Sequence, residues 1–416
     1  MICKIKLICS SLLLLYISGA AWAQETKKPF KGQDPIKRVP TAPRAVAKQW
    51  KGVFSNPDST LFFSNNFPGG RLSGITQVND TLYEAIIVPE NSPINASPWY
   101  AFKVWSKENK SIHLRLHYMN RVKHRYTPKV STNGKDWELK TGQLASDGRG
   151  FEFQLTVGKD TTWVAAQELQ TLAEVENWVR GLNVPVKTEL MGYSREGRPL
   201  KAYRIGNLES KNVILVMGRQ HPPEVTGHFA LTAFMEVLVG ETDIAQQFRS
   251  DFQIYMIPMP NPDGVEGGFW RHNAGGVDMN RDWATFQHPE TQVIRDYFKT
   301  QLTAAHTLYF MIDFHSTFED IYYTLSPEMK RNTHGLLDKW MQAIRKGVPD
   351  YDPHVKVLYL EPPTVTAYSY FYETYGAESL IYEIGDATPR DFIREKSEVS
   401  ASALMRLLEE EIKNKE

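Results

Sequence analysis

Three side chains have the types and the spacing that suit a metal site. His221 and Glu224 are three residues apart, and His315 stands in the run Asp313-Phe314-His315-Ser316. This spacing lets a tight turn or the start of a helix aim an imidazole nitrogen and a carboxylate oxygen at one point. Each signal alone is weak, because a His–Glu pair in a loop and a single His at a strand end are common in structural roles. Together the three residues predict the ligand set of a catalytic zinc, with one position open for water.

Four further side chains are candidates for acid–base chemistry or for binding an anion. Arg271, Asn280 and Arg281 lie in the connection that begins with Asn261-Pro262-Asp263-Gly264. Two arginines and an asparagine can clamp a carboxylate or stabilise an oxyanion, although ordinary surface arginines are the simpler interpretation. Glu383 lies in an apolar run, where a carboxylate costs several kcal/mol unless it is paired or functional. Glu383 therefore either does chemistry or pairs with one of the arginines.

The elements that must position these residues alternate between helix and strand after Gln167. This alternation predicts an α/β domain with a mostly parallel sheet and helices on both faces. Ligands of such sheets bind beyond the carboxyl ends of the strands, and the candidate groups follow predicted strands. Apolar runs predict strands over 212–217, 252–257 and 308–314, and helical patterns predict helices over 168–181, 229–239 and 289–302.

The preceding region, 51–165, has a different pattern, with short alternating runs separated by turn residues. Asn133-Gly134 between two such runs predicts a hairpin with a tight turn that needs positive φ at both central positions. We therefore expect an antiparallel β-sandwich domain before the catalytic domain at 166–416.

The first residues have the features of an export signal. Lys4 and Lys6 precede an apolar run over 7–17, and Ala21-Trp22-Ala23 is a small-x-small cleavage pattern. The run is short for a membrane anchor, which needs ~20 apolar residues. We therefore predict a signal peptide over 1–23, a polar, Pro-rich linker over 24–50, and a secreted or periplasmic protein with no stable membrane insertion after cleavage.

Composition narrows the class of protein. The 416 residues are 42% hydrophobic, and 48 Lys and Arg balance 48 Asp and Glu. These values exclude a disordered chain and a basic nucleic-acid binder, so no nucleic-acid partner is expected. A chain of this length buries a core without metal staples, so a bound metal would serve chemistry. Both cysteines, Cys3 and Cys9, lie in the predicted signal, which leaves none for disulfides in the mature chain.

The order of His-x-x-Glu, Asn-Pro-Asp-Gly, Arg, Asn-Arg, strand-end His and late Glu resembles the zinc metallocarboxypeptidases of the carboxypeptidase A-like family. The resemblance covers 169–408. It implies that one Zn²⁺ per chain is held by His221, Glu224 and His315. It also implies that Glu383 is the general base, that Arg271 stabilises the oxyanion, and that Asn280 and Arg281 bind the terminal carboxylate of a peptide substrate.

The β-rich region adds a second resemblance. The runs Phe63-Ser64-Asn65-Asn66-Phe67 and Trp99-Tyr100-Ala101-Phe102 are similar to the amino-terminal domain of the cytosolic-carboxypeptidase branch, which is mostly intracellular. In this family a tyrosine commonly closes over the substrate, and Tyr368, Tyr370 and Tyr372 all lie in the corresponding stretch. The segment 357–382 contains no Lys, Arg or His, which favours aromatic or aliphatic terminal side chains over acidic ones.

Three functions follow as hypotheses. The leading one is a zinc carboxypeptidase that acts on peptides outside the cytoplasm. The second is an amidase or carboxypeptidase on the same scaffold that opens the stem peptides of the cell wall. The third is a binding protein in which the β-sandwich carries the function and the enzyme domain is vestigial.

Overall fold

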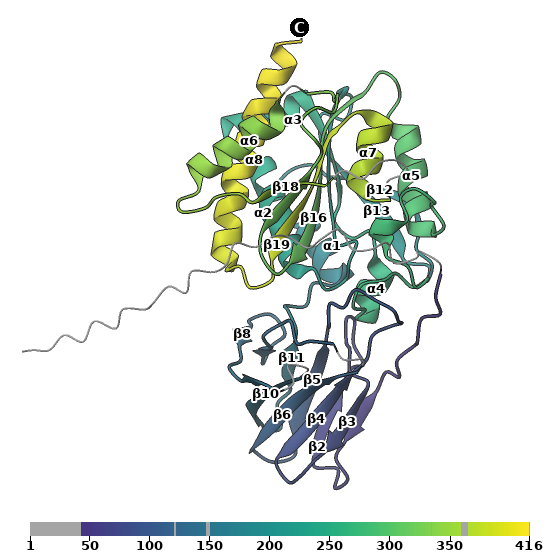
Figure 1. Cartoon of the computed structure of the whole chain (residues 1–416), viewed down its shortest axis with the longest axis vertical. Coiled ribbons are helices and arrows are strands. Elements are labelled where there is room, and N and C mark those ends of the chain that lie inside the picture. Colours follow the sequence, from purple (N-terminus) through teal and green to yellow (C-terminus); the bar gives the residue numbers. More distant parts are fainter. Residues whose placement is uncertain (1–42, 120–121, 147–149, 334, 359–364, 416) are drawn as a thin grey trace, which may run out of the picture. The chain divides into compact units, whose positions relative to one another are not determined.

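An eight-stranded sheet organises the carboxyl-terminal part of the described chain (Figure 1). The structure is a computed structural model and describes residues 43–119, 122–146, 150–333, 335–358 and 365–415. The strands are β12 (Lys187–Tyr193), β13 (Pro199–Gly206), β14 (Asn212–Gly218), β15 (Phe252–Ile257), β16 (Thr307–Thr317), β17 (Ile321–Thr324), β18 (Val355–Val357) and β19 (Glu378–Gly385), in the spatial order β12-β13-β15-β14-β16-β19-β17-β18.

The predicted parallel sheet is present at the centre and gives way to antiparallel pairing on both sides. β14 is parallel to β15 and to β16, and β16 is parallel to β19. By contrast, β12 with β13, β13 with β15, and β17 with β19 are antiparallel, and the edge strand β18 is parallel to β17. Short connections reverse the chain around β12 and β17, whereas a parallel pair needs a long crossover.

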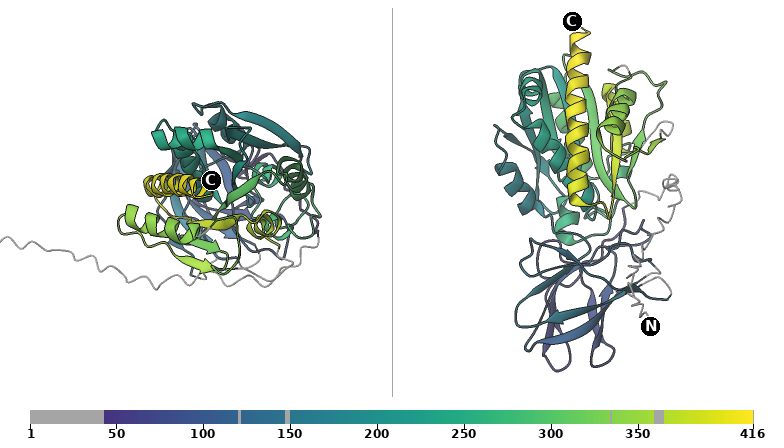
Figure 2. Two further views of the ribbon diagram at one scale, coloured as in Figure 1. Left: turned by 90° about the horizontal axis from the view of Figure 1, so that it is seen from above. Right: turned by 90° about the vertical axis from the view of Figure 1, so that its left-hand side faces the viewer.

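Helices cover both faces of this sheet (Figure 2). One face carries α2 (Val225–Leu238), α3 (Asp243–Asp251), α6 (Leu336–Gly347) and α8 (Arg390–Lys413), whose apolar side chains share a core with the central strands. The opposite face carries α5 (Pro289–Gln301) and α7 (Ala367–Tyr375). The remaining helices are α1 (Leu172–Arg180), α4 (Pro262–Gly267) and the short 3₁₀ helix η1 (Met279–Arg281).

The predicted elements of this region are present with shifted ends. β15 has its predicted bounds, and α5 ends one residue earlier than predicted. α1 begins at Leu172 instead of 168, because Thr171 and Glu174 form a capping box that fixes its amino end. β16 continues to Thr317, three residues beyond its predicted end, so His315 lies within the strand.

The amino-terminal region is a sandwich of two sheets that share one apolar core. β4 and β6 show the alternating burial expected for strands with one face toward a core. The first sheet has the order β1-β2-β5-β11-β7-β8, from β1 (Val53–Ser55), β2 (Leu61–Ser64), β5 (Ala101–Ser106), β11 (Thr162–Ala165), β7 (Lys129–Ser131) and β8 (Glu138–Leu139). The second has the order β3-β4-β6-β10-β9, from β3 (Gly74–Gln77), β4 (Leu82–Ile87), β6 (Lys110–Tyr118), β10 (Gly150–Val157) and β9 (Gln143–Leu144).

Two details of the sandwich differ from the prediction. β4 and β6 are parallel, because β5 between them crosses to the other sheet and the chain returns in the same direction. The predicted hairpin exists as the antiparallel pair β7 and β8, but residues 132–137 connect it. The tight two-residue turn is therefore wrong: of its two central residues, only Gly134 has positive φ, at 74°.

The predicted signal over 1–23 lies outside the described residues, as does the linker up to residue 42. The described end of the linker is hydrogen-bonded to the sandwich. The Ala47 amide donates to the Glu90 carbonyl at 2.7 Å, and the Gln49 side chain donates to the Gly70 carbonyl at 2.8 Å. Among the described residues, no helix is long and apolar enough to cross a membrane.

Candidate metal centre

The three predicted ligands converge in one buried cluster. His221 lies in the loop after β14, Glu224 is the residue before the first turn of α2, and His315 lies near the carboxyl end of β16. One ligand atom from each lies within 4.8 Å of the others, and all three residues are buried. Glu224 Oε1 lies 2.8 Å from His221 Nδ1, and Glu224 Oε2 lies 2.7 Å from His315 Nδ1. Two imidazoles and a carboxylate in a buried cluster are a donor set that fits Zn²⁺.

Two aspartates hold the outer nitrogens of the histidines. His221 Nε2 lies 2.9 Å from Asp278 Oδ1, and His315 Nε2 lies 2.8 Å from Asp313 Oδ2. A carboxylate at Nε2 places the proton there and leaves Nδ1 as the free lone pair that faces the cluster. Sequence reasoning did not assign either aspartate, although Asp313 shares a strand face with His315 at a spacing of two, which is a detectable signal.

The charges of the cluster depend on one another. Burial alone would raise the pKa of Glu224, but His221 and His315 outweigh it and hold that pKa well below its usual value. Burial alone would lower the pKa of His315, but Asp313 and Glu224 raise it well above its usual value. The Glu224 carboxylate therefore stays ionised between the two histidines, and its negative charge favours a cation at this point.

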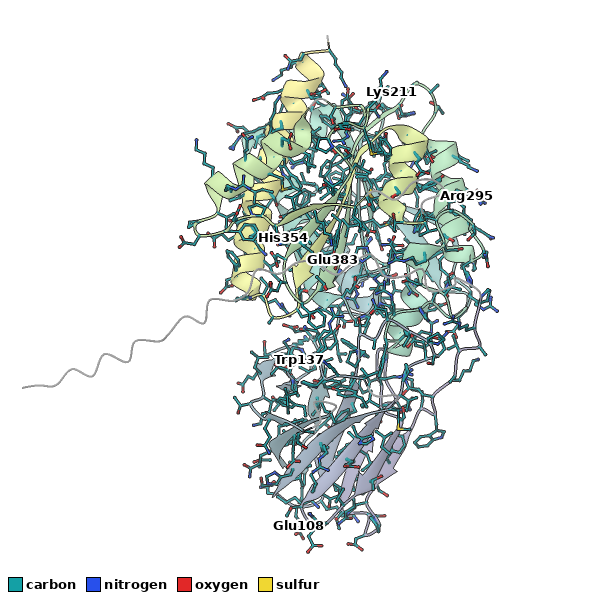
Figure 3. The ribbon with its side chains drawn as sticks, viewed as in Figure 1. Glu108, Trp137, Lys211, Arg295, His354 and Glu383 are labelled. Carbon is teal, nitrogen blue, oxygen red and sulfur yellow. The ribbon has the colours of Figure 1, made fainter. Side chains whose placement is uncertain are left out.

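Glu383 faces the same site from the neighbouring strand. Glu383 and His315 are directly paired residues of the parallel strands β19 and β16, so their side chains lie on the same face of the sheet. Figure 3 labels Glu383, which stands two residues before the carboxyl end of β19. Burial and the nearby Glu224 raise its pKa to about 7, against the opposing effect of His315. Within the described part of the chain, its Oε2 is buried and has no hydrogen-bond partner.

Arg271 is fixed by an ion pair beside the cluster. Its Nε donates to Asp278 Oδ2 at 2.7 Å, so a single aspartate holds both this arginine and the ligand His221. Burial opposes its charge, but Asp278 and Glu224 raise the pKa of Arg271 above its usual value. The guanidinium is therefore a permanent cation at the edge of the cluster.

Asn280 and Arg281 lie in η1 on the same side of the site. Asn280 Nδ2 is 3.5 Å from His315 Nε2, and its Oδ1 accepts a hydrogen bond from the amide of Ala367 at 2.9 Å. Arg281 donates from Nη1 to the Asn280 carbonyl at 2.7 Å. Burial lowers its pKa, and Asp278 opposes that effect. The structure thus brings all seven predicted site residues into one region.

The Asn-Pro-Asp-Gly run supports the site without facing it. The Asn261 side chain caps α4 and donates to the carbonyl of Gln220 at 3.0 Å and to that of His272 at 3.2 Å. It therefore ties the loop that carries His221 to the segment that carries Arg271. Asp263 accepts hydrogen bonds from Ser194 and Arg198, which are on a neighbouring turn.

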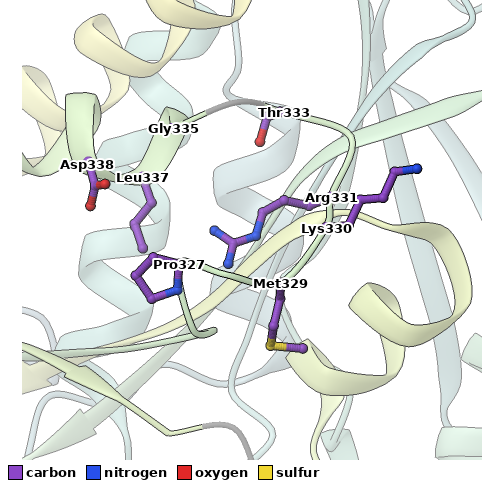
Figure 4. A pocket seen from close by; sticks show the side chains of 8 residues that line it. All are labelled: Pro327, Met329, Lys330, Arg331, Thr333, Gly335, Leu337 and Asp338. Carbon is purple, nitrogen blue, oxygen red and sulfur yellow. The ribbon is translucent and has the colours of Figure 1, made fainter.

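A pocket on another part of the sheet does not belong to this site. It is lined by residues of the connection between β17 and α6, including Lys330 and Arg331, and by residues of the first turn of α6, including Asp338 (Figure 4). Arg331 pairs with Glu378 at 3.0 Å, and Glu378 is the first residue of β19. The pocket therefore adjoins the amino end of β19, whereas Glu383 and the metal ligands lie toward the carboxyl ends of the strands.

The sequence matches a known protein family. The sequence model of the family described as zinc carboxypeptidase matches residues 176–412, which is more than half of the chain. The matched segment contains the three clustered ligands, Glu383, Arg271, Asn280 and Arg281.

Individual proteins show the same likeness. Cytosolic carboxypeptidase 3 from Mus musculus is 24% identical over 270 residues, and the match covers 56% of this chain but 27% of that protein. An uncharacterized protein of Zymomonas mobilis is 24% identical over 317 residues, which cover 71% of this chain and 79% of that protein. The crystal structure of a metallo-carboxypeptidase from Burkholderia cenocepacia has a TM-score of 0.71 at 18% identity, covering 84% of this chain and 99% of its own. The fold likeness therefore extends beyond the catalytic region into the sandwich.

Proposed function

Because the chain belongs to the zinc carboxypeptidase family, we propose that it removes carboxyl-terminal residues from peptides with a free terminal carboxylate, and that it does so outside the cytoplasm. The proposal rests above all on one arrangement, in which Glu383 stands in register with His315 beside the buried His221–Glu224–His315 cluster. The export part rests on the sequence features of residues 1–23 alone.

The cluster would hold one Zn²⁺ through His221, Glu224 and His315. When bound, Zn²⁺ polarises the scissile carbonyl and lowers the pKa of bound water toward ~7. Glu383 accepts a proton from the attacking water and later delivers one to the leaving amine. Its buried Oε2 has no hydrogen-bond partner among the described residues, so no described donor occupies the oxygen that would accept the proton.

The two arginines bind different parts of the substrate. Arg271, held by Asp278, stabilises the negative charge that develops on the carbonyl oxygen. Asn280 and Arg281 bind the terminal carboxylate of the substrate, which restricts the enzyme to chain ends. Two of the three candidate tyrosines differ in their surroundings. Tyr368 lies close enough to Arg281 to raise its pKa, whereas the ring of Tyr370 packs against Trp283 and Phe286.

The terminal side chain that the enzyme prefers is aromatic or aliphatic in this proposal. The sequence between 357 and 382 supplies no Lys, Arg or His that would pair with an acidic terminal residue, and residues 359–364 of that stretch lie outside the described structure. The activity is proposed for this chain on the basis of its own residues. The chain spans only about a quarter of the length of the mouse relative that it matches.

Digestion of a mixed peptide library and of muropeptides by the purified protein tests this function. We expect stepwise loss of carboxyl-terminal residues, read by mass spectrometry and abolished by a zinc chelator. Cleavage confined to muropeptides would replace the proposal with a cell-wall activity. Zinc binding without cleavage of either substrate class would contradict both activities and favour a binding role for the chain.

Two variants test the assigned roles. Glu383→Gln should keep its zinc and lose turnover, because an amide cannot accept the proton.

Arg281→Ala should impair peptides with a free terminal carboxylate far more than amidated peptides. Equal losses on both kinds of substrate would remove Arg281 from carboxylate binding.

A further inference from the structure

The core of the β-sandwich contains residues that adjoin the active site in sequence. Trp270, next to Arg271, and Val225, next to the ligand Glu224, are both fully buried in the apolar core formed by the sandwich strands. The indole nitrogen of Trp270 donates to the carbonyl of Trp99 in the sandwich at 2.9 Å. Two residues of the catalytic region, each next to a residue of the candidate site, therefore belong to the core of the sandwich.

A single sandwich carboxylate binds the backbone that carries Arg271. Glu90, which follows β4, is fully buried, and its Oε2 accepts the amide of Trp270 at 2.8 Å. Its Oε1 accepts the amides of Arg271 at 3.0 Å and of His272 at 2.8 Å. Three consecutive backbone amides therefore donate to one carboxylate. This contact holds the segment firmly, because charge-assisted hydrogen bonds are roughly twice as strong as neutral ones.

Asn91, the next residue of the sandwich, also contacts this segment. Asn91 Oδ1 lies 2.7 Å from His272 Nδ1, and Asn91 Nδ2 donates to the Gly276 carbonyl at 3.2 Å. Arg271 is therefore held at both ends, its backbone by Glu90 and its guanidinium by Asp278. Because Asp278 also holds the ligand His221, any shift of the 270–272 backbone changes the place of the guanidinium relative to the metal ligands.

We propose that Glu90 is a positioning residue for hydrolysis, which acts through Arg271 and makes the β-sandwich a working part of the active site. This inference rests on the proposed function, in which Arg271 stabilises the oxyanion. A misplacement of about 1 Å in such a group costs on the order of 10²-fold in rate. Gln at position 90 retains one acceptor oxygen and presents an NH₂ group to an amide donor, so it cannot accept all three hydrogen bonds.

The kinetic test compares Glu90→Gln with a matched control in the same domain. Glu84→Gln makes the same change at a sandwich carboxylate on β4, which pairs with Arg115 on β6 at 2.8 Å. We expect Glu90→Gln to lower kcat by about 10-fold or more with KM nearly unchanged, and Glu84→Gln to leave both unchanged. If Glu90→Gln fails to fold, Glu90→Asp keeps the charge on a side chain too short to reach all three amides, and it should lower kcat with KM nearly unchanged, whereas an unchanged kcat would overturn the proposal.

A double-mutant cycle separates positioning from general stability. In an Arg271→Ala background, Glu90→Gln should cause no further loss of kcat, because the group that it positions is gone. An equal loss in both backgrounds would overturn the proposal, as would an unchanged kcat in the wild-type background.

Two readouts do not depend on activity. In Glu90→Gln, hydrogen exchange at the amides of residues 270–272 should accelerate, and its crystal structure should show the Arg271 guanidinium displaced from Asp278. If the wild-type enzyme cleaves no peptide, the proposed function fails, while these two measurements still decide whether Glu90 positions Arg271. Unchanged exchange and an unmoved guanidinium would refute the positioning role even in an active enzyme.

Discussion

At the scale of single residues, the metal centre depends on side chains that hydrogen-bond the ligand histidines. Asp278 and Asp313 each accept from the Nε2 atom of a histidine whose Nδ1 faces the cluster. Gln220 in turn donates a hydrogen bond from Nε2 to Asp313 Oδ2, and its Oε1 accepts one from the indole nitrogen of Trp283. These partners fix the orientation of the two rings before any metal binds, which reduces the cost of assembling the site.

Asp313→Asn should therefore weaken zinc binding by about 10- to 100-fold without removing a ligand, because the amide lacks the charge that increases the basicity of His315. Competition with a chromophoric chelator measures the dissociation constant. Asp296→Asn is the control, since that aspartate is exposed and pairs with Arg295 on the surface of α5. An unchanged dissociation constant in Asp313→Asn would show that ring orientation does not depend on this carboxylate.

Glu409 should give the unfolding free energy a pH dependence unconnected with catalysis. Burial and the neighbouring Asp251 raise its pKa from 4.5 to about 7. The folded state then binds the proton more tightly than the unfolded state, so stability falls as pH rises from 4.5 to about 7 and the loss is complete above that range.

Glu409→Gln removes this titration, so its stability relative to the wild type should be greater at pH 8 than at pH 4. Urea unfolding at the two pH values measures the difference. If the stability change caused by the substitution is the same at both, the raised pKa is refuted.

At the scale of elements, the first turn of α2 presses against the strand that carries His315. The amide of Gly227 and the hydroxyl of Thr226 both donate to Ser316 Oγ at 2.8 Å. Glycine is required at 227 by this close approach, since an added Cβ would lie 2.4 Å from the His315 carbonyl oxygen. The helix that begins after Glu224 and the strand that carries His315 are thereby held together, which places two ligands from distant parts of the chain.

Gly227→Ala should lower both zinc affinity and thermal stability, because the nearest obstacle is backbone and cannot rotate away. Gly74→Ala is the matched control, where the nearest atom would be 3.6 Å from the new Cβ. Metal content after dialysis and the unfolding temperature measure the two effects. Full zinc occupancy at the wild-type melting temperature would show that α2 can move away from β16 without cost.

At the scale of the whole molecule, the sandwich and the catalytic region are joined by charged groups as well as by apolar packing. Arg125, in the connection between β6 and β7, donates from Nε to Asp386 Oδ2 at 2.7 Å and from Nη2 to the Ser316 carbonyl at 3.2 Å. Asp386 follows the end of β19, and Ser316 follows His315. A sandwich side chain therefore ties together the ends of the two strands that carry His315 and Glu383.

Arg125→Ala should destabilise the protein by about 3–5 kcal/mol, because it leaves the buried carboxylate of Asp386 without its cation. The exposed pair Arg345–Asp352 provides the control, since Arg345→Ala should cost no more than about 1 kcal/mol. Denaturant unfolding of both variants measures the contrast. Similar small losses in the two would show that the Arg125–Asp386 pair does not hold the regions together.

Local sequence patterns predicted the residues that the structure brings into one cluster, and the order of the elements that carry them. His-x-x-Glu, the strand-end His and the late Glu are local patterns, and the buried strands around them read as continuous apolar runs whose bounds were nearly right, as for β15. These features depend on side-chain chemistry and hydrophobic periodicity, both of which are visible within a few residues.

The way in which these residues are held depends on contacts between distant parts of the chain. The partners Asp278, Glu90 and Arg125 are separated in sequence from the groups they contact by 57, 181 and 261 residues, respectively. The antiparallel flanks of the sheet and the parallel β4–β6 pair likewise depend on how the chain crosses between layers. Such pairings arise from burial and packing of distant segments, which no local pattern encodes.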